Sequence, residues 1–202
     1  MFDPLSASPD VNDSAGVDVV LGIDPGVSCC GYGAVMREKG TFRPVAYGVI
    51  RTPAADPLPE RLAVLSRELE SLVDELAPKA IAVERVLFQV NARTAMSVGQ
   101  ASGLALAIAG RKRISVVQYS PNEVKLAIAG DGSAGKEEVQ QMVARLLGLA
   151  EPPRPPDAAD ALALSLCHWW QAPMRAATNA GGDGANRLDA AIAAAIQKQG
   201  GG

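Results

Sequence analysis

The chain has 202 residues, of which 48% are hydrophobic and 20% are charged, and its formal net charge is −3. These values are typical of a globular protein with one domain, and they exclude a highly charged disordered chain. Three cysteines without a CxxC pair are too few for a disulfide framework, and no apolar run reaches the ~20 residues that span a membrane. Because residues 1–16 contain no Lys or Arg, we expect no signal peptide. We therefore expect a cytoplasmic protein that does not associate with membranes.

The two ends of the chain differ in composition from the part between them. Residues 1–16 contain Asp and Pro but no Lys or Arg, and residues 173–202 are rich in Ala and Gly. We expect a disordered N-terminal tail, a mobile C-terminal tail and a folded domain over residues 17–172.

The first three elements of the predicted domain are strands. Residues 17–24 form a short apolar run that ends at an Asp-Pro-Gly turn, which indicates a buried strand. Residues 31–37 and 42–51 are predicted to be two further strands, joined by a Lys-Gly turn. Because both connections are short, we expect an antiparallel meander.

Helices and strands alternate in the rest of the domain. Leucines recur with helical spacing from Leu58 to Leu76, which predicts a helix that packs one face on the sheet. Further strands are predicted at 80–86 and 114–119, and further helices at 92–110, 122–129, Lys136–Leu147 and from Asp157 to about Trp170. This order predicts an α/β fold with a mixed five-stranded sheet flanked by helices.

Four acidic residues are candidates for a functional site. Two lie beside apolar strands, where burying an unpaired charge is unfavourable, and two share one face of a predicted helix. Asp24 ends the first strand and Glu84 lies near the end of the fourth, each beside an apolar run. Asp157 and Asp160 are three residues apart at the start of a helix, so their side chains share one face. Because side chains at the strand ends of an open α/β sheet converge, we predict that these four carboxylates form one site.

Four oxygen ligands suit Mg²⁺ or Mn²⁺ rather than zinc. Two such ions, roughly 3.5–4 Å apart, can hydrolyse a phosphodiester, because one activates water while the other stabilises the leaving 3′ oxygen. Each acid also has a structural explanation: Asp24 can belong to a turn, Asp157 can cap a helix and Glu84 can pair with an arginine. A metal-dependent nuclease is favoured because these explanations would have to hold in three separate segments at once.

Several short motifs follow one another in a characteristic order from about Val19 to His168. They are Gly22-Ile-Asp-Pro-Gly26, Gly31-Tyr-Gly33, Val83-Glu-Arg-Val86, Val124-Lys125, Gly132-Ser133-Ala134 and Asp157-Ala-Ala-Asp160-Ala-Leu-Ala. This combination strongly resembles the RuvC family of crossover junction endodeoxyribonucleases, over most of the chain.

The resemblance implies an RNase H-like fold and a homodimer that binds a four-way Holliday junction during DNA recombination and repair. Each subunit would nick one of two strands of like polarity and leave 5′-phosphate and 3′-hydroxyl ends. The matching positions make Asp24, Glu84, Asp157 and Asp160 the metal-binding residues, with Asp24, Glu84 and Asp157 as the catalytic set. A branch-migration complex of RuvA and RuvB is implied as a partner.

The resemblance also assigns DNA contacts to named positions. Lys125 and Lys136 match basic residues that contact DNA in the family, although a lone lysine is more often only a surface charge. The family usually has an aromatic residue three positions after the catalytic Glu, whereas this chain has Leu87 there and Phe88 next. Either side chain can act as the wedge at the junction centre, and we favour Phe88 because an aromatic ring stacks on bases.

Two other functions remain to be distinguished from junction resolution. A catalytically silent RNase H-like module that binds nucleic acid or protein would have no reason to keep four acids together. An RNase H-like nuclease acting on another branched substrate would keep all of them. The helix predicted at 92–110 is rich in Ala, Gly and Ser, which is compatible with either a dimer interface or a buried core helix.

Overall fold

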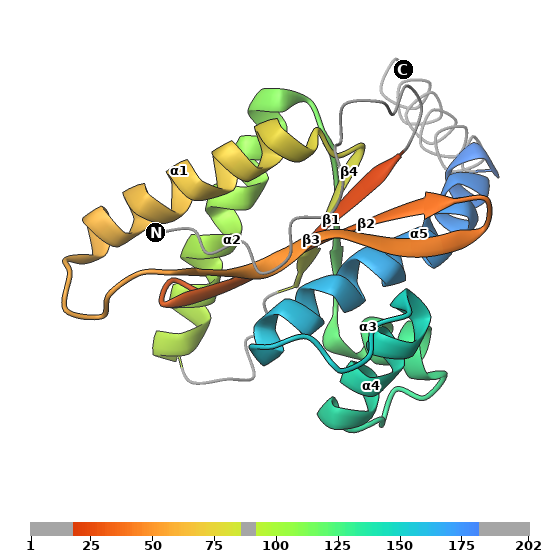
Figure 1. The fold of residues 1–202 in the computed structure, drawn as a ribbon. Coiled ribbons are helices and arrows are strands. Elements are labelled where there is room, and N and C mark those ends of the chain that lie inside the picture. The colour runs from red at the N-terminus through yellow and green to blue at the C-terminus, as the bar shows by residue number, and fades with distance from the viewer. Residues whose placement is uncertain (1–17, 86–91, 182–202) are drawn as a thin grey trace, which may run out of the picture. The chain divides into compact units, whose positions relative to one another are not determined.

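The structure, a computed structural model, describes residues 18–85 and 92–181. Within these ranges, one mixed sheet has the strand order β3-β2-β1-β4-β5 (Figure 1). The strands are β1 (Val19–Asp24), β2 (Cys29–Glu38), β3 (Thr41–Arg51), β4 (Ala80–Glu84) and β5 (Ser115–Tyr119). β1, β2 and β3 pair antiparallel, whereas β4 pairs parallel with β1 and β5. The predicted meander and the predicted mixed five-stranded sheet are both confirmed.

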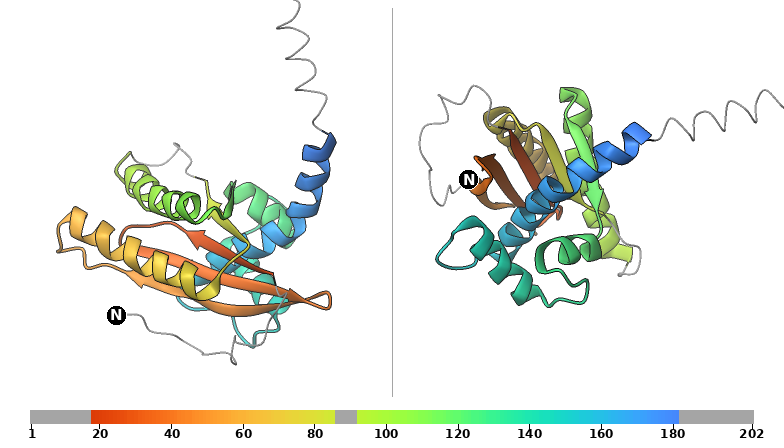
Figure 2. Two further views of the ribbon diagram at one scale, coloured as in Figure 1. Left: turned by 90° about the horizontal axis from the view of Figure 1, so that it is seen from above. Right: turned by 90° about the vertical axis from the view of Figure 1, so that its right-hand side faces the viewer.

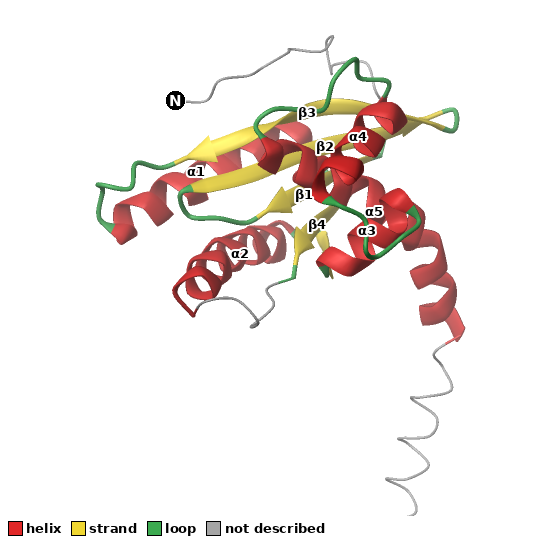
Figure 3. Cartoon of the chain, turned by 90° about the horizontal axis from the view of Figure 1, so that it is seen from below, coloured by secondary structure: helices red, strands yellow, loops and turns green. Residues whose placement is uncertain are grey.

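Helices lie on both faces of this sheet. They are α1 (Leu58–Leu76), α2 (Ala92–Lys112), α3 (Pro121–Ala129), α4 (Lys136–Leu147) and α5 (Pro156–Gly181). α1 and α2 cover one face, and the N-terminal part of α5 lies on the other, with α3 and α4 on the same side (Figures 1 and 3). Figure 2 shows the same two layers of helices from above and from the side. Within the two described ranges, no helix combines the length and the hydropathy that crossing a bilayer requires.

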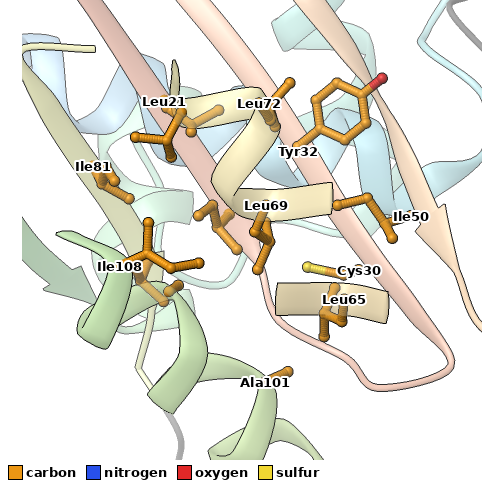
Figure 4. Close-up of a cluster of buried hydrophobic side chains, with 14 of the residues drawn as sticks. Leu21, Cys30, Tyr32, Ile50, Leu65, Leu69, Leu72, Ile81, Ala101 and Ile108 are labelled. Carbon is orange, nitrogen blue, oxygen red and sulfur yellow. The ribbon is translucent and has the colours of Figure 1, made fainter. Parts of the chain in front are cut away.

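The face of the sheet under α1 and α2 carries the main hydrophobic core (Figure 4). Side chains of a strand alternate between its two faces, so Leu21 and Ile23 of β1 point into this core. Leu65, Leu69 and Leu72 recur at helical spacing on α1 and are buried against them. Burial of each such leucine stabilises the fold by about 1.5–3 kcal/mol. The leucine periodicity therefore predicted the packed face of α1 correctly.

The opposite face is built for the close approach of α5. A Cβ atom on Gly22 would lie 1.9 Å from the backbone oxygen of Ala161, and one on Gly33 would lie 2.6 Å from the backbone nitrogen of Leu162. The Ser165 hydroxyl donates a hydrogen bond of 2.5 Å to the carbonyl oxygen of Gly33. α5 thus rests directly on the backbone of β1 and β2, because glycine leaves room that no other residue leaves.

Several elements begin or end a few residues from their predicted positions; α2, for example, ends at Lys112 rather than at residue 110. β4 ends at Glu84 rather than at residue 86, and α5 extends to Gly181 rather than ending near Trp170. Pro173 lies inside α5 without ending it. A proline removes only one backbone donor, so turns on both sides can keep a helix continuous. Of the described residues, those up to His168 belong to one compact unit and residues 169–181 to another.

Candidate active site

Two of the four predicted acids end neighbouring parallel strands. Asp24 is the last residue of β1 and Glu84 is the last residue of β4. The register pairs Ile23 with Val83, so the next residue on each strand projects from the face that α5 covers. The carboxyl ends of parallel strands lie at the same edge of a sheet, which places Asp24 and Glu84 side by side.

The start of α5 brings the other two acids to the same place. A Cβ atom on Gly31 would lie 2.2 Å from the backbone oxygen of Asp157, and Gly31 is the strand partner of Asp24. The first turn of α5 is therefore seated beside Asp24. The negative charges of both Asp157 and Asp160 act on the Asp24 carboxyl. The structure thus places the other three predicted acids within electrostatic reach of Asp24.

A pocket of about 290 Å³ opens above these carboxylates. It is lined by Asp24, Glu84, Pro121, Val124, Lys125, Lys136, Val139, Asp160, Ala163 and Leu164. Its charged groups are three of the predicted acids and both predicted DNA-binding lysines, while its remaining side chains are apolar. The carboxylates would repel an anionic ligand in this pocket, so such a ligand can bind only if cations neutralise the carboxylate charges.

The two acids at the strand ends hold a proton in the metal-free protein. Burial, the negative charge of Glu84 and a hydrogen bond with Glu84 together raise the pKa of Asp24 to about 8. Burial also raises the pKa of Glu84, while the hydrogen bond from Asp24 opposes that shift. The Asp24 carboxylic acid therefore donates to the Glu84 carboxylate, because two adjacent charged carboxylates would repel each other.

Asp160 and Asp157 each have a different partner. The ammonium group of Lys136 lies 2.7 Å from Asp160 Oδ2, and this contact raises the pKa of Lys136. Asp157 makes a hydrogen bond with the thiol of Cys29. Sequence reasoning considered Cys29 only as part of the cysteine count. No signal in the sequence could have identified this contact, because it depends on the seating of the first turn of α5 over Gly31.

The donor set of this site fits a hard divalent cation. It consists of carboxylate oxygens, which are the ligands that Mg²⁺ and Mn²⁺ prefer. Asp24 and Glu84 are buried beside each other, and a bound divalent cation would displace the proton that they share. Among the described residues, no three His, Cys, Asp or Glu side chains are close enough to form a complete ligand cluster. Asp24 and Glu84 are thus the pair that would hold an ion, with Asp157 and Asp160 as the nearest further donors.

The predicted wedge residues, Leu87 and Phe88, lie outside the described part of the chain, and the only histidine, His168, does not line the pocket. His168 is buried, and its Nδ1 atom lies 3.0 Å from the hydroxyl of Tyr119. This contact joins the end of β5 to α5, which gives His168 a packing role rather than a place in the pocket.

Comparisons with known proteins identify the family of this chain. The family model described as crossover junction endodeoxyribonuclease RuvC matches residues 20–168. A protein of that name from Salinispora arenicola is 50% identical over 171 residues, which are 83% of this chain and 97% of the relative. The protein of that name from Rhodococcus opacus is 51% identical over 156 residues, which are 77% of this chain and 82% of the relative.

Solved structures show the same relationship. The structure of Thermus thermophilus RuvC superposes with a TM-score of 0.72 at 40% identity and covers 77% of this chain and 96% of that protein. The structure of the same protein in complex with a Holliday junction substrate superposes with a TM-score of 0.70 at 36% identity. This match covers 78% of the present chain and 96% of the other. The predicted RNase H-like fold is thus confirmed, and the chain belongs to the RuvC family of crossover junction endodeoxyribonucleases.

Proposed function

We infer that this protein is a crossover junction endodeoxyribonuclease that resolves four-way Holliday junctions in DNA recombination and repair. The observation that carries this inference is the family match over residues 20–168, which contains every element that contributes to the acidic pocket. We further propose that it makes paired symmetric nicks in strands of like polarity. The products are then 5′-phosphate and 3′-hydroxyl ends.

Family membership carries metal dependence, and we propose Mg²⁺ as the ion, with two per active site and Mn²⁺ as a substitute. Asp24 and Glu84 would hold the metal, with Asp157 and Asp160 beside them. The chemistry that Mg²⁺ supplies in such a site is activation of water and stabilisation of the leaving 3′ oxygen. The Asp24 carboxyl would have to be deprotonated to act as a ligand, and Lys125 and Lys136, which line the pocket, would bind phosphate oxygens.

A cleavage assay on a synthetic four-way junction tests this function. The wild-type protein with Mg²⁺ is expected to nick the junction symmetrically and to leave linear duplex uncut. Asp24→Asn is expected to bind the junction with wild-type affinity and to lose at least about 100-fold in cleavage rate, because an amide replaces a charged ligand. Asp56→Asn, in the exposed loop before α1, is the matched control and should cut normally.

Three outcomes would contradict the proposal in different ways. Normal cutting by Asp24→Asn would refute the ligand assignment. Equal cutting of linear duplex would refute the substrate, and preferential cutting of another branched DNA would identify a different nuclease. Junction binding by the wild-type protein without cutting in any divalent metal would indicate a silent binding module.

We also propose that the protein acts as a homodimer through α2. One side of this helix is buried, with Ala101, Ala105 and Ile108 in the main core. On its other side, Met96 is 66% exposed and Leu106 is 37% exposed. Exposed apolar side chains on one helix support a contact with a second copy, and two-fold symmetry would place two active sites on one junction.

Two features of the cellular setting remain proposals. RuvA and RuvB are expected partners, because the family resemblance implies a branch-migration complex. A cytoplasmic location is expected because the three cysteines provide no disulfide framework and junction DNA is the substrate.

A further inference from the structure

A second hollow adjoins the active-site pocket on the side of α4. Its volume is about 540 Å³, and we call it the α4 groove. It is lined by Lys136, Glu137, Gln140, Gln141, Pro152, Arg154 and Pro156. Lys136 lines both hollows, so the α4 groove begins where the pocket above the carboxylates ends.

The charge of the α4 groove suits an anionic chain. It contains Arg154, Lys136, whose ammonium is paired with Asp160, and one carboxylate, together with two glutamine amides that can donate hydrogen bonds. Arg154 is exposed, and no carboxylate among the described residues forms a salt bridge with it. Arg111, in contrast, is paired with Glu70 on the opposite layer of helices. Arg154 therefore keeps its full capacity for two parallel hydrogen bonds to a phosphate.

We propose that the α4 groove binds the sugar-phosphate backbone of the cleaved strand next to the scissile bond, with Arg154 as its main phosphate contact. This inference rests on the proposed function, because a strand that is cut in the pocket has to continue past Lys136. The groove offers a route along the first turns of α4 in which Gln140 and Gln141 supply neutral donors. Contacts of this kind position the strand without reading its sequence.

Removing the charge of Glu137 should have the opposite effect on DNA binding from removing the charge of Arg154. The Glu137 carboxylate lines the same groove and would repel a phosphate that lies there. Loss of the Arg154 charge should weaken binding, whereas loss of the Glu137 charge should strengthen it. A groove that does not contact DNA would show neither effect.

Junction binding measured by fluorescence anisotropy in EDTA over a series of salt concentrations tests the groove without cleavage. Arg154→Ala is expected to raise Kd roughly fivefold and to reduce the slope of log K against log salt by about 1. Arg154→Lys should recover the slope, and Glu137→Gln should lower Kd. Arg67→Ala, which removes the same charge from an exposed site on α1, is the matched control and should leave both quantities unchanged.

Junctions with single neutral methylphosphonate linkages locate the contact on the DNA. One linkage beside the scissile bond should weaken wild-type binding and have no further effect on Arg154→Ala, because the two changes remove the same interaction. The proposal is wrong if Arg154→Ala keeps the wild-type salt slope, or if every linkage weakens wild type and variant equally. Failure of the proposed function would appear differently, as equal binding of the wild-type protein to junction and linear duplex.

Discussion

Asp24 is a proposed metal ligand, and its pKa is shifted strongly by its surroundings. Its pKa rises from 3.8 to about 8 because it is buried and lies beside Glu84. In the unfolded chain the same carboxyl ionises near its ordinary pKa. The folded-state pKa lies above the unfolded value, so its effect favours the folded state most below pH 3.8 and is lost progressively as the pH rises to about 8. The site thus reduces stability at neutral pH in the absence of metal.

Asp24→Asn should remove this cost. The amide still donates a hydrogen bond to Glu84 but carries no charge, so the metal-free variant is expected to be more stable than wild type at pH 7. The expected gain is at least about 1 kcal/mol, or roughly 2–4 °C in Tm. Thermal melts in EDTA between pH 5 and 9 should show the wild-type Tm falling relative to that of the variant as pH rises. Parallel curves would show that Asp24 is not protonated in the folded protein.

The N-terminal part of α5 is the element on which the geometry of the site depends. Its backbone lies against Gly22, Gly31 and Gly33, and its first turn carries Asp157 and Asp160. The 1.9 Å between a Cβ on Gly22 and the Ala161 oxygen involves backbone on both sides, so no rotamer change relieves it. A side chain there has to displace either β1 or α5.

Gly22→Ala is therefore expected to lower the free energy of unfolding by about 1–3 kcal/mol and to reduce cleavage by shifting α5 away from Asp24. Gly103→Ala is the matched control, because Gly103 is an exposed helical glycine with nothing within 4 Å of a new Cβ. It should stabilise α2 by about 0.5–1 kcal/mol. Urea titrations and junction cleavage rates measure both effects, and equal stability of the two variants would refute the close seating of α5.

At the scale of the whole molecule, the proposed dimer relates two active sites to the two strands that must be cut. The exposed apolar side of α2 is the surface that we assign to this contact. Burying Met96 and Leu106 against a second copy would remove apolar surface from water, which is the main driving force of association.

Leu106→Glu is expected to shift the protein from dimer to monomer, because it places a charge in this contact. Sedimentation should then give the monomer mass of 20.9 kDa instead of twice that value. Junction cleavage should change from paired to single nicks. Leu58→Glu changes a similarly exposed leucine on α1 and should leave the mass unchanged. A wild-type protein that is a monomer on junction DNA would refute the dimer.

Local patterns in the sequence were sufficient to predict the elements and to select the four acids as candidates. Alternation in β1 and helical spacing in α1 depend on neighbouring residues, so their buried faces were predictable. The ends of elements were less predictable. A proline inside α5 indicates a break by itself, yet the helix continues past it.

The tertiary structure alone decided how these pieces meet. Parallel pairing of β1 with β4 and the seating of α5 on Gly22, Gly31 and Gly33 join segments far apart in the chain, and no local periodicity encodes such contacts. The same contacts bury Asp24 beside Glu84 and bring Lys136 to Asp160. The sequence by itself determined which residue types are available for metal and DNA. Folding decided their distances and burial, and hence the proton that Asp24 holds, because electrostatic energies depend on separation and desolvation rather than on order along the chain.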